Sequence, residues 1–255
     1  MKKTLINPVA GVFRLLFGAL YCVFMAAACQ SSNKAQTLID QAITAHGGEA
    51  WQDKRIEFDF RKFHLTLEHQ GGKFRYERAQ RDSLGAEIRD ILTNESFVRT
   101  INGQKQVLDS VQVGKYSRAV NSVAYFVLLP FKLRDPAVLA DYVGEGTVDG
   151  QRYDKVRVRF RADGGGKDHG DTFCYWFNQQ THTMDYLSYS DEGPRFRKAI
   201  HPQVVGGIRF QDYINYKSND TDTTASIRYD QQYMAGQFTE LSRIENKNIR
   251  VVPLR

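Results

Sequence analysis

Apolar residues recur at two different spacings along this chain. Between residues 35 and 46 they recur every three to four positions, which predicts an amphipathic helix that ends at Gly47 and Gly48. From residue 56 onward they alternate with polar residues, and a period of two is typical of strands with one covered face. We therefore expect one helix first and mainly β-structure after it.

Short turn sequences divide the β-region into hairpins. Gly71-Gly72, Asn102-Gly103 and Asp149-Gly150 each separate two strand-like segments, as the residues of tight turns do. The predicted strands cover residues 56–67, 73–81, 97–101, 106–108, 143–148, 153–160, 172–177, 184–189, 195–200, 208–216, 225–233 and 238–244. Strands joined by such short turns predict a single antiparallel sheet that is strongly curved.

Two later segments interrupt this pattern with helical spacing. Residues 111–129 are helical in part and end at Pro130. Asp135 suits an N-cap and Pro136 a first helical position, so a short helix is predicted through Asp141. Two or three helices then accompany about ten strands. Neither a repeat nor a linker interrupts this pattern, so we interpret residues 35–255 as a single domain.

The first 28 residues have the composition of a signal peptide. They contain three basic residues and no Asp or Glu, and residues 15–28 form an apolar run of 14 residues. That run is too short for a permanent membrane span, and small residues close it directly before Cys29. We predict a signal peptide over residues 1–28. At Cys29 the alternative to lipidation is an ordinary signal peptide followed by an incidental cysteine.

The segment from Ala26 to Cys29 resembles a bacterial lipobox, although Ala26 stands where that family usually has leucine. The resemblance implies cleavage before Cys29, a covalent lipid anchor on Cys29 and a short polar tether, together covering residues 29–34. A lipid anchor of this kind attaches a protein firmly to a membrane. Gln30 stands where aspartate would signal inner-membrane retention in lipoproteins of enteric type, so the resemblance favours the outer membrane.

The positive charge of the chain comes partly from its first residues. Without residues 1–28, 32 Lys and Arg oppose 29 Asp and Glu, so the net charge falls from +6 to +3. No run of five basic residues occurs, and nucleic-acid binding is therefore not indicated. With Cys22 removed and Cys29 lipidated, Cys174 is the remaining cysteine, so we expect no internal disulfide.

Four stretches of sequence carry a resemblance to known families. They are residues 38–51 (LIDQAITAHGGEAW), 124–136 (AYFVLLPFKLRDP), 164–178 (GGGKDHGDTFCYWFN) and 193–213 (GPRFRKAIHPQVVGGIRFQDY). The last three resemble an uncharacterised family of Bacteroidota lipoproteins known only as a domain of unknown function. The first, together with a curved sheet and few helices, resembles more distantly the LolA/LolB-like lipoprotein carrier superfamily. That superfamily implies a half-open barrel with two or three helices on its concave side, and an apolar cavity that holds acyl chains.

The aromatic strand at residues 172–177 and the segment 120–131 are the candidates for lining such a cavity. Successive side chains of the strand alternate between its faces, and both faces are largely apolar, so either both are covered or one lines an apolar pocket. The segment 120–131 is a candidate lid, with a simple core helix as the alternative. The residues that we expect to line the cavity are Trp51, Phe126, Leu129, Phe131, Tyr175 and Trp176.

A polar, glycine-rich loop is the main candidate for other chemistry. Asp168, His169 and Asp171 offer oxygen and nitrogen ligands, so a divalent metal or an acid–base pair is a hypothesis for this loop. The alternative is a polar hairpin loop that bonds to nearby backbone, since no HExxH, CxxC or EF-hand spacing is present. His46 either stabilises the end of the first helix or lines the mouth of the cavity.

Because no familiar catalytic motif occurs, the sequence favours a binding protein over an enzyme. The leading hypothesis is a membrane-anchored envelope lipoprotein of the outer membrane that holds a lipid or other hydrophobic ligand in a half-barrel cavity, without a cofactor. One alternative is a metal-assisted hydrolase that uses Asp168, His169 and Asp171. The other is an envelope scaffold that binds a protein partner and no ligand, and the sequence does not identify that partner.

Overall fold

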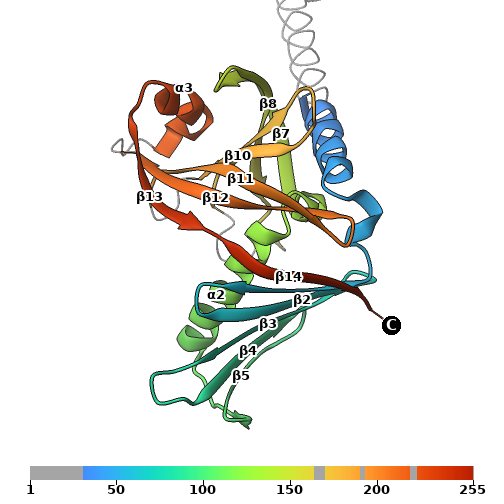
Figure 1. Cartoon of the computed structure of the whole chain (residues 1–255), viewed down its shortest axis with the longest axis vertical. Helices are drawn as coiled ribbons and strands as arrows, with labels where there is room; N and C mark the ends of the chain where they lie inside the picture. The colour runs from blue at the N-terminus through green and yellow to red at the C-terminus, as the bar shows by residue number, and fades with distance from the viewer. Residues whose placement is uncertain (1–30, 164–169, 190–192, 219–222, 255) are drawn as a thin grey trace, which may run out of the picture.

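The computed structural model describes residues 31–163, 170–189, 193–218 and 223–254, whose strands form two antiparallel sheets of seven strands each (Figure 1). The first sheet has the strand order β14-β1-β2-β3-β4-β5-β6, and the second has the order β13-β12-β11-β10-β9-β8-β7. The first contains β1 (Lys54–Phe60), β2 (Phe63–Gln70), β3 (Lys73–Arg81), β4 (Glu87–Thr93), β5 (Phe97–Ile101), β6 (Gln104–Lys105) and β14 (Asn246–Pro253). The second contains β7 (Val138–Val148), β8 (Gln151–Phe160), β9 (Phe173–Asn178), β10 (Met184–Tyr189), β11 (Arg195–Val205), β12 (Ile208–Ser218) and β13 (Phe238–Ile244).

All three predicted hairpin turns are confirmed by their backbone angles, and Gly71 and Gly72 have φ values of 55° and 78°. Asn102 and Gly103 have φ values of 47° and 79°, and Asp149 and Gly150 have values of 50° and 76°. Two consecutive residues with positive φ give a turn whose twist matches that of the flanking strands. Asn, Asp and Gly tolerate this conformation better than other residues, which is why these pairs mark the turns in the sequence.

The first sheet packs one face against α2 (Ser110–Val127), which runs from beside this sheet toward the second (Figure 1). Asp109 caps the helix: its side chain accepts from the Gln112 N–H, and the Gln112 side chain accepts from the Asp109 N–H. Val120 and Ala124 of α2 are fully buried against apolar side chains of the sheet. The opposite face of the sheet is lined mainly by charged pairs such as Arg55–Glu68.

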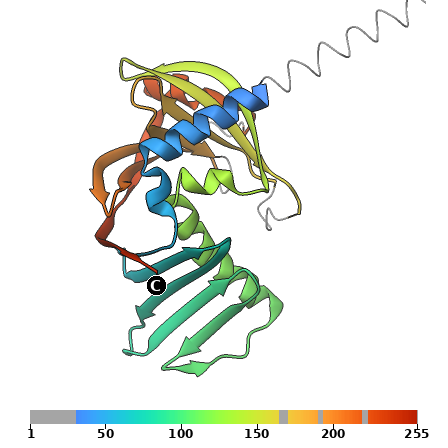
Figure 2. The same cartoon turned by 90° about the vertical axis from the view of Figure 1, so that its right-hand side faces the viewer.

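Other parts of the chain cover both faces of the second sheet. For the aromatic strand at residues 172–177, the sequence had predicted either this or one face lining an apolar pocket. The helix of residues 31–45 lies across one face, which we call the inner face (Figure 2). On the other face, the outer face, η3 (Thr223–Arg228) and α3 (Tyr229–Met234) bury Trp176 beside Tyr229. Three clusters of buried side chains result: one in the first sheet and one on each face of the second.

The two sheets meet at a tight junction. The chain passes from β13 to β14 at Glu245, and the next residue, Asn246, donates its N–H to Asp212 Oδ1 over 2.9 Å. Nearby, the Arg209 N–H donates to the His46 carbonyl over 3.0 Å. Gly47 has a φ of +127°, and a Cβ there would lie 2.7 Å from the Gly207 carbonyl oxygen. The junction therefore needs glycine at residue 47 both for its backbone angle and for space.

The prediction of one curved sheet is wrong, because the strands form two sheets and do not close into a barrel in the described parts of the chain. After β6 the chain follows α2 to the second sheet, so β6 and β7 never pair. β14, which the turn pattern missed, returns to pair with β1, for example Val251 opposite Ile56. The pairing of β1 with β14 joins residues about 190 positions apart, so no local sequence pattern indicates it. β4 was also missed, because its sequence does not alternate between apolar and polar residues.

Four local predictions are also wrong. The strand predicted over residues 56–67 is two strands, β1 and β2, which pair across a turn at residues 61 and 62, where Arg61 has a φ of 55°. Instead of a helix after Asp135, η2 (Phe131–Arg134) ends there and β7 follows, because pairing with β8 satisfies its backbone groups. Residues 225–233 form η3 and α3 in place of a strand, since this segment covers Trp176 on the outer face. Residues 106–108, predicted as a strand, form no strand and connect β6 to Asp109, the N-cap of α2. None of the described helices is long and apolar enough to cross a membrane.

Candidate functional site

The inner face of the second sheet changes from apolar to polar across its strands. One row of cross-strand partners runs over β8 to β12 and consists of Val156, Tyr175, Leu187, Arg197 and Asn215. The first three are fully buried in the cluster that includes the helix of residues 31–45. Arg197 and Asn215 are polar, yet they are only 8 % and 7 % exposed. Two buried polar side chains therefore lie at the end of an apolar row.

Arg197 carries a buried positive charge that no acidic side chain of the described residues neutralises. Its guanidinium lies 3.9 Å from the ring centre of Phe126 and 5.0 Å from that of Tyr189. Its Nη2 donates a 2.6 Å hydrogen bond to the Tyr189 hydroxyl, whereas its Nε is buried without a partner. Burial lowers the pKa of the Arg197 guanidinium, although arginine stays protonated in proteins. A buried ion without a counter-ion costs several kcal/mol, and ring contacts return only part of that.

Aromatic rings lie around this guanidinium on the side of α2. The ring of Phe126 lies 5.6 Å from that of Tyr189 and 6.5 Å from that of Phe173, between centres. The Phe160 ring lies 5.8 Å from Phe173 and 6.1 Å from Tyr125. We call Tyr125, Phe126, Phe160, Phe173 and Tyr189 the aromatic layer. Phe173 is buried whereas Phe126, Phe160 and Tyr189 are half-buried, so the layer reaches from the interior to the surface.

A pair of tyrosines connects α2 to the inner face. The hydroxyl oxygens of Tyr125, on α2, and Tyr175, on β9, are 2.6 Å apart. Burial raises the pKa of both phenols, so each hydroxyl is neutral and one donates to the other. Ala124 of α2 packs in the cluster of the first sheet, whereas the next residue, Tyr125, packs against the second sheet, so α2 contacts both sheets. The last turn of α2 is therefore the part of the chain that covers the aromatic end of the inner face.

The six residues predicted to line a cavity do not lie on one surface. Leu129, Tyr175 and Phe126 belong to the inner-face cluster or pack against it. Trp51 and Phe131 stack on each other in the first-sheet cluster, with ring centres 5.6 Å apart. Trp176 follows Tyr175 in the strand and so points to the outer face. Phe126, Leu129 and Tyr175 are thus the predicted residues that the fold brings together.

His46 is buried at the junction of the two sheets. Its Nε2 accepts the Met184 N–H over 3.1 Å, and its carbonyl oxygen accepts from the Trp51 Nε1–H over 3.1 Å. Burial, together with the positive charge of the nearby Arg209, lowers the pKa of His46 to about 4. The His46 imidazole is therefore neutral at pH 7. Of the two roles considered for His46, the contacts support a structural one at the end of the helix.

The predicted metal loop lies mostly outside the described residues, and so does the predicted lipidation site. Asp168, His169 and Cys29 are among those that the structure does not describe, whereas Asp171 is described just before β9. In the described ranges no three His, Cys, Asp or Glu side chains are grouped so that they can hold a metal ion. The metal hypothesis therefore stays a prediction from the sequence.

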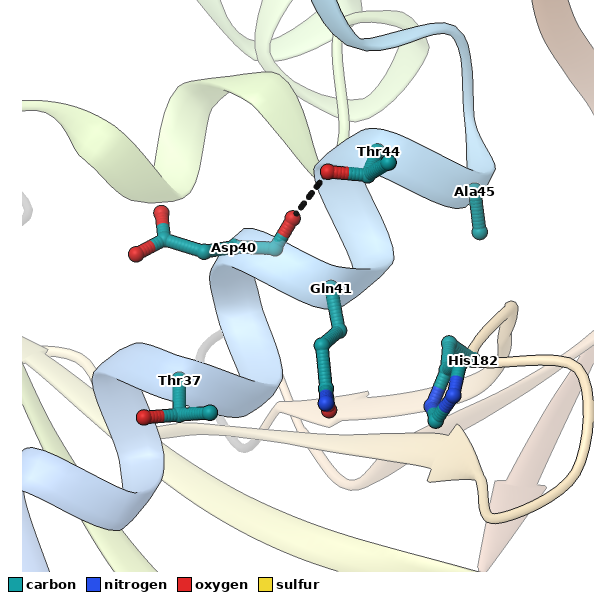
Figure 3. Close-up of a pocket in the computed structure, with 6 residues that line it drawn as sticks. All are labelled: Thr37, Asp40, Gln41, Thr44, Ala45 and His182. Carbon is teal, nitrogen blue, oxygen red and sulfur yellow. Dashed lines mark hydrogen bonds between the residues drawn. The ribbon is translucent and has the colours of Figure 1, made fainter.

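Neither of two hollows on the surface of the described residues matches the apolar cavity that was expected. One, of about 440 Å³, lies beside the helix of residues 31–45 and is lined by Thr37, Asp40, Gln41, Thr44, Ala45 and His182 (Figure 3). Its Thr44 hydroxyl is already used, since it donates to the Asp40 carbonyl over 2.9 Å. The other, of about 450 Å³, is lined by residues of β1 to β4, of β14 and of the turn between β1 and β2, among them the charged Arg61 and Glu87. The inner face is instead filled by side chains of the protein itself.

Arg197 and Tyr189 are absent from the residues that sequence reasoning selected. In β11, the basic residues 195 and 197 alternate with Phe196, a pattern that is typical of a strand with one solvent-facing side. The structure shows Arg197 buried beneath Phe126, a residue 71 positions earlier in the chain. Only this long-range contact distinguishes Arg197 from a surface arginine.

A family model described as "Family of unknown function (DUF6503)" matches residues 14–246. No curated protein matches the chain in sequence. Among solved structures, the chain is similar to a LolA superfamily protein from Nitrosomonas europaea, with a TM-score of 0.49 and 10% identity, over 87% of this chain and 94% of that one. It is also similar to a DUF1329 family protein from Desulfovibrio piger, with a TM-score of 0.39 and 10% identity, over 85% and 92%. The likeness to the lipoprotein LppX from Mycobacterium tuberculosis has a TM-score of 0.30 and 10% identity, over 63% and 89%. Likenesses this distant carry no ligand or partner over to this chain.

Proposed function

The chain belongs to the DUF6503 family, whose function is unknown, and from that premise we propose that it binds a lipid or other hydrophobic ligand between α2 and the inner face of the second sheet. The proposal is carried by the aromatic layer. Four of its five rings, those of Tyr125, Phe126, Phe160 and Tyr189, are half-buried and lie next to a buried interior. Such rings offer a surface on which an acyl chain is removed from water.

The binding energy for an acyl chain comes from its apolar surface alone. Each methylene removed from water contributes about 0.8 kcal/mol, so about twelve methylenes contribute roughly 10 kcal/mol before the costs of association. Catalytic or metal-binding residues are not needed for such binding. This agrees with a site that has few polar contacts among the described residues, such as the Tyr125–Tyr175 pair and the Arg197–Tyr189 hydrogen bond.

Entry of the ligand requires the last turn of α2 to move off the inner face. Tyr125 and Phe126 are the residues of that turn which contact the sheet, and the Tyr125–Tyr175 hydrogen bond is the polar contact that holds it. A ligand chain then lies between Phe126 and the rings of Phe173 and Tyr189. Of the predicted cavity residues, Phe126, Leu129 and Tyr175 line this path, whereas Trp51, Phe131 and Trp176 support the two other clusters.

The protein acts in this proposal as a membrane-anchored lipoprotein of the bacterial cell envelope. The charged start, the apolar run of residues 15–28 and the lipobox-like segment before Cys29 support an anchor on Cys29. Gln30 after it supports the outer membrane. The anchor brings the inner face close to the lipid from which a hydrophobic ligand is taken.

Native mass spectrometry of residues 30–255 tests the proposal, because this piece contains every residue that the structure describes. We expect a co-purifying mass of lipid size that solvent extraction releases. Phe126→Glu is expected to abolish it, because the new carboxylate lies in the path of the chain. Phe97→Glu is the matched control, since Phe97 is a half-buried ring that packs in the first-sheet cluster.

Two other results would count against lipid binding. A bare polypeptide mass that stays bare after incubation with lipid vesicles would favour a scaffold without a ligand. A divalent metal found in the same sample, and lost in His169→Ala, would favour the hydrolase alternative and the loop at residues 164–171.

A further inference from the structure

The guanidinium of Arg197 lies at the point where the aromatic layer meets the inner face of the second sheet. An apolar core does not need a charge here, because neutral side chains such as Leu187 fill the neighbouring position of the same row. We propose that Arg197 binds the carboxylate of a long-chain fatty acid whose hydrocarbon chain occupies the aromatic layer. This inference rests on the proposed function and names the ligand class of that same site.

The hydrogen-bonding groups around Arg197 have capacity for an anion. Nη2 is engaged by Tyr189, but Nε is buried without an acceptor. The neighbouring Asn215 also has an unmatched atom, since its Oδ1 is buried without a partner while its Nδ2 donates to Ser242 over 3.4 Å. A flip of this amide turns its NH₂ group toward the unmatched side. A carboxylate, which accepts several hydrogen bonds, therefore satisfies Arg197 Nε and finds a second donor on Asn215.

The charges on this end of the sheet favour a single negative charge on the ligand. Two residues before Arg197, Arg195 lies on the same face of β11 and pairs across the strands with Lys217. Both are more exposed than Arg197 and lie toward the edge of the face. Among the described residues, Arg197 is the basic side chain that is buried in contact with the aromatic layer. One buried positive charge matches one carboxylate, whereas a phosphate would bring up to two negative charges to the same site.

The geometry also gives the direction of the chain. Phe126 of α2 lies directly over the guanidinium, and Phe173 of β9 and Phe160 of β8 follow in ring contacts across the sheet. A fatty acid with its carboxylate on Arg197 therefore extends its methylenes along these three rings. Carboxylate and chain thus occupy the polar and the apolar parts of one continuous site.

Photo-crosslinking on the full chain in phosphatidylcholine nanodiscs tests this inference. The probes are hexadecanoic acid, hexadecanol and hexadecyl phosphate, each with the same diazirine group on the chain, at pH 8. Labelled peptides are identified by mass spectrometry. Apparent affinities come from competition by the same compounds without the diazirine. The variants are Arg197→Met, which keeps an unbranched apolar stem but removes the charged guanidinium, and Arg243→Met. Arg243 is an exposed arginine of β13 in the same sheet, paired with Glu240, so it matches the change in net charge.

We expect the acid to bind the wild-type chain about tenfold or more tightly than the alcohol, which is the usual effect of a charge-assisted hydrogen bond. Labels are expected in peptides of residues 120–131 and of β9 to β11. Arg197→Met is expected to bind acid and alcohol equally and to bind the alcohol as the wild type does. Arg243→Met should keep the tenfold preference.

Equal binding of acid and alcohol by the wild-type chain would overturn the carboxylate site and leave hydrophobic binding standing. A preference for the phosphate over the acid would likewise overturn it. Absence of all three labels from these peptides would refute the proposed function as well as this inference. If Arg197→Met does not fold, the comparison of the three probes on the wild-type chain alone decides the outcome.

Discussion

Removal of one hydroxyl from the Tyr125–Tyr175 pair should loosen the cover of the inner face. Tyr125→Phe leaves the Tyr175 hydroxyl, in a side chain with 0 % exposure, without the partner that is 2.6 Å away in the wild type. A buried polar group without a partner costs about 1–3 kcal/mol, which exceeds the roughly 0.5–1.5 kcal/mol net worth of a typical hydrogen bond. We therefore expect Tyr125→Phe to lower the free energy of unfolding by about 2 kcal/mol.

The double variant Tyr125→Phe/Tyr175→Phe separates the two contributions. It replaces both partners with apolar rings of the same shape, so it leaves no unmatched hydroxyl and should be more stable than Tyr125→Phe alone. Urea unfolding followed by circular dichroism measures the stability of all four members of the cycle. Uptake of a fluorescent fatty acid measures access to the inner face, and the single variant should take it up faster. If the double variant is less stable than the single one, or if Tyr125→Phe matches the wild type in both assays, the hydroxyl pair does not hold the last turn of α2.

Three further predictions concern the core and the junction. His46 has a pKa of about 4 in the folded protein, below its usual 6.5, so the unfolded chain takes up the proton first as the pH falls. The free energy of unfolding should then decrease between about pH 6.5 and pH 4, by up to about 1.4 kcal/mol per pH unit from this group. Urea midpoints across this range should show a shallower dependence in His46→Gln, with His201→Gln, an exposed histidine, unchanged from wild type. Lys155→Met leaves Asp230, whose side chain is 2 % exposed, without the Nζ at 3.2 Å. This should cost about 3–5 kcal/mol. Lys155→Met/Asp230→Asn should recover part of that loss in the same urea assay, and a double variant no better than the single one would contradict this view of the pair. Gly47→Ala should destabilise the junction by about 1–3 kcal/mol because of its positive φ and the 2.7 Å approach to the Gly207 carbonyl. Gly170→Ala, which meets nothing within 4 Å, should leave the melting temperature unchanged, and equal effects of the two substitutions would refute the steric reasoning.

The turns, the first helix and the alternation within strands could be predicted from the sequence, because each depends on residues close together in the chain. The turns at Asn102-Gly103 and Asp149-Gly150 follow from residues that accept positive φ. The first helix was expected over residues 35–46, and the structure shows helix over residues 31–45, because one apolar stripe predicts it. The alternation of Tyr175 and Trp176 between two covered faces was likewise open to prediction from the period of a strand.

Of the candidate site, the sequence alone indicated the segment of residues 120–131 and the aromatic strand, but not the residue that distinguishes the site. Arg195 and Arg197 alternate with Phe196 in the strand, which is the pattern of residues on a solvent-facing side. The burial of Arg197 results from the position of Phe126, which α2 brings over β11. The separation of Trp51, Phe131 and Trp176 from Phe126 was equally hidden, because apolar residues look alike in a sequence whichever cluster they join.

The sequence by itself determined where the chain turns and which segments alternate between apolar and polar residues. It also showed the basic and apolar character of the first 28 residues. The tertiary structure decided that the strands divide into two sheets, that β14 returns to β1, and that a charged side chain lies inside the second sheet. The physical reason is range. Turns and periods depend on a few neighbouring residues, whereas strand partners and burial depend on contacts between residues far apart in the chain, which many different sequences can form.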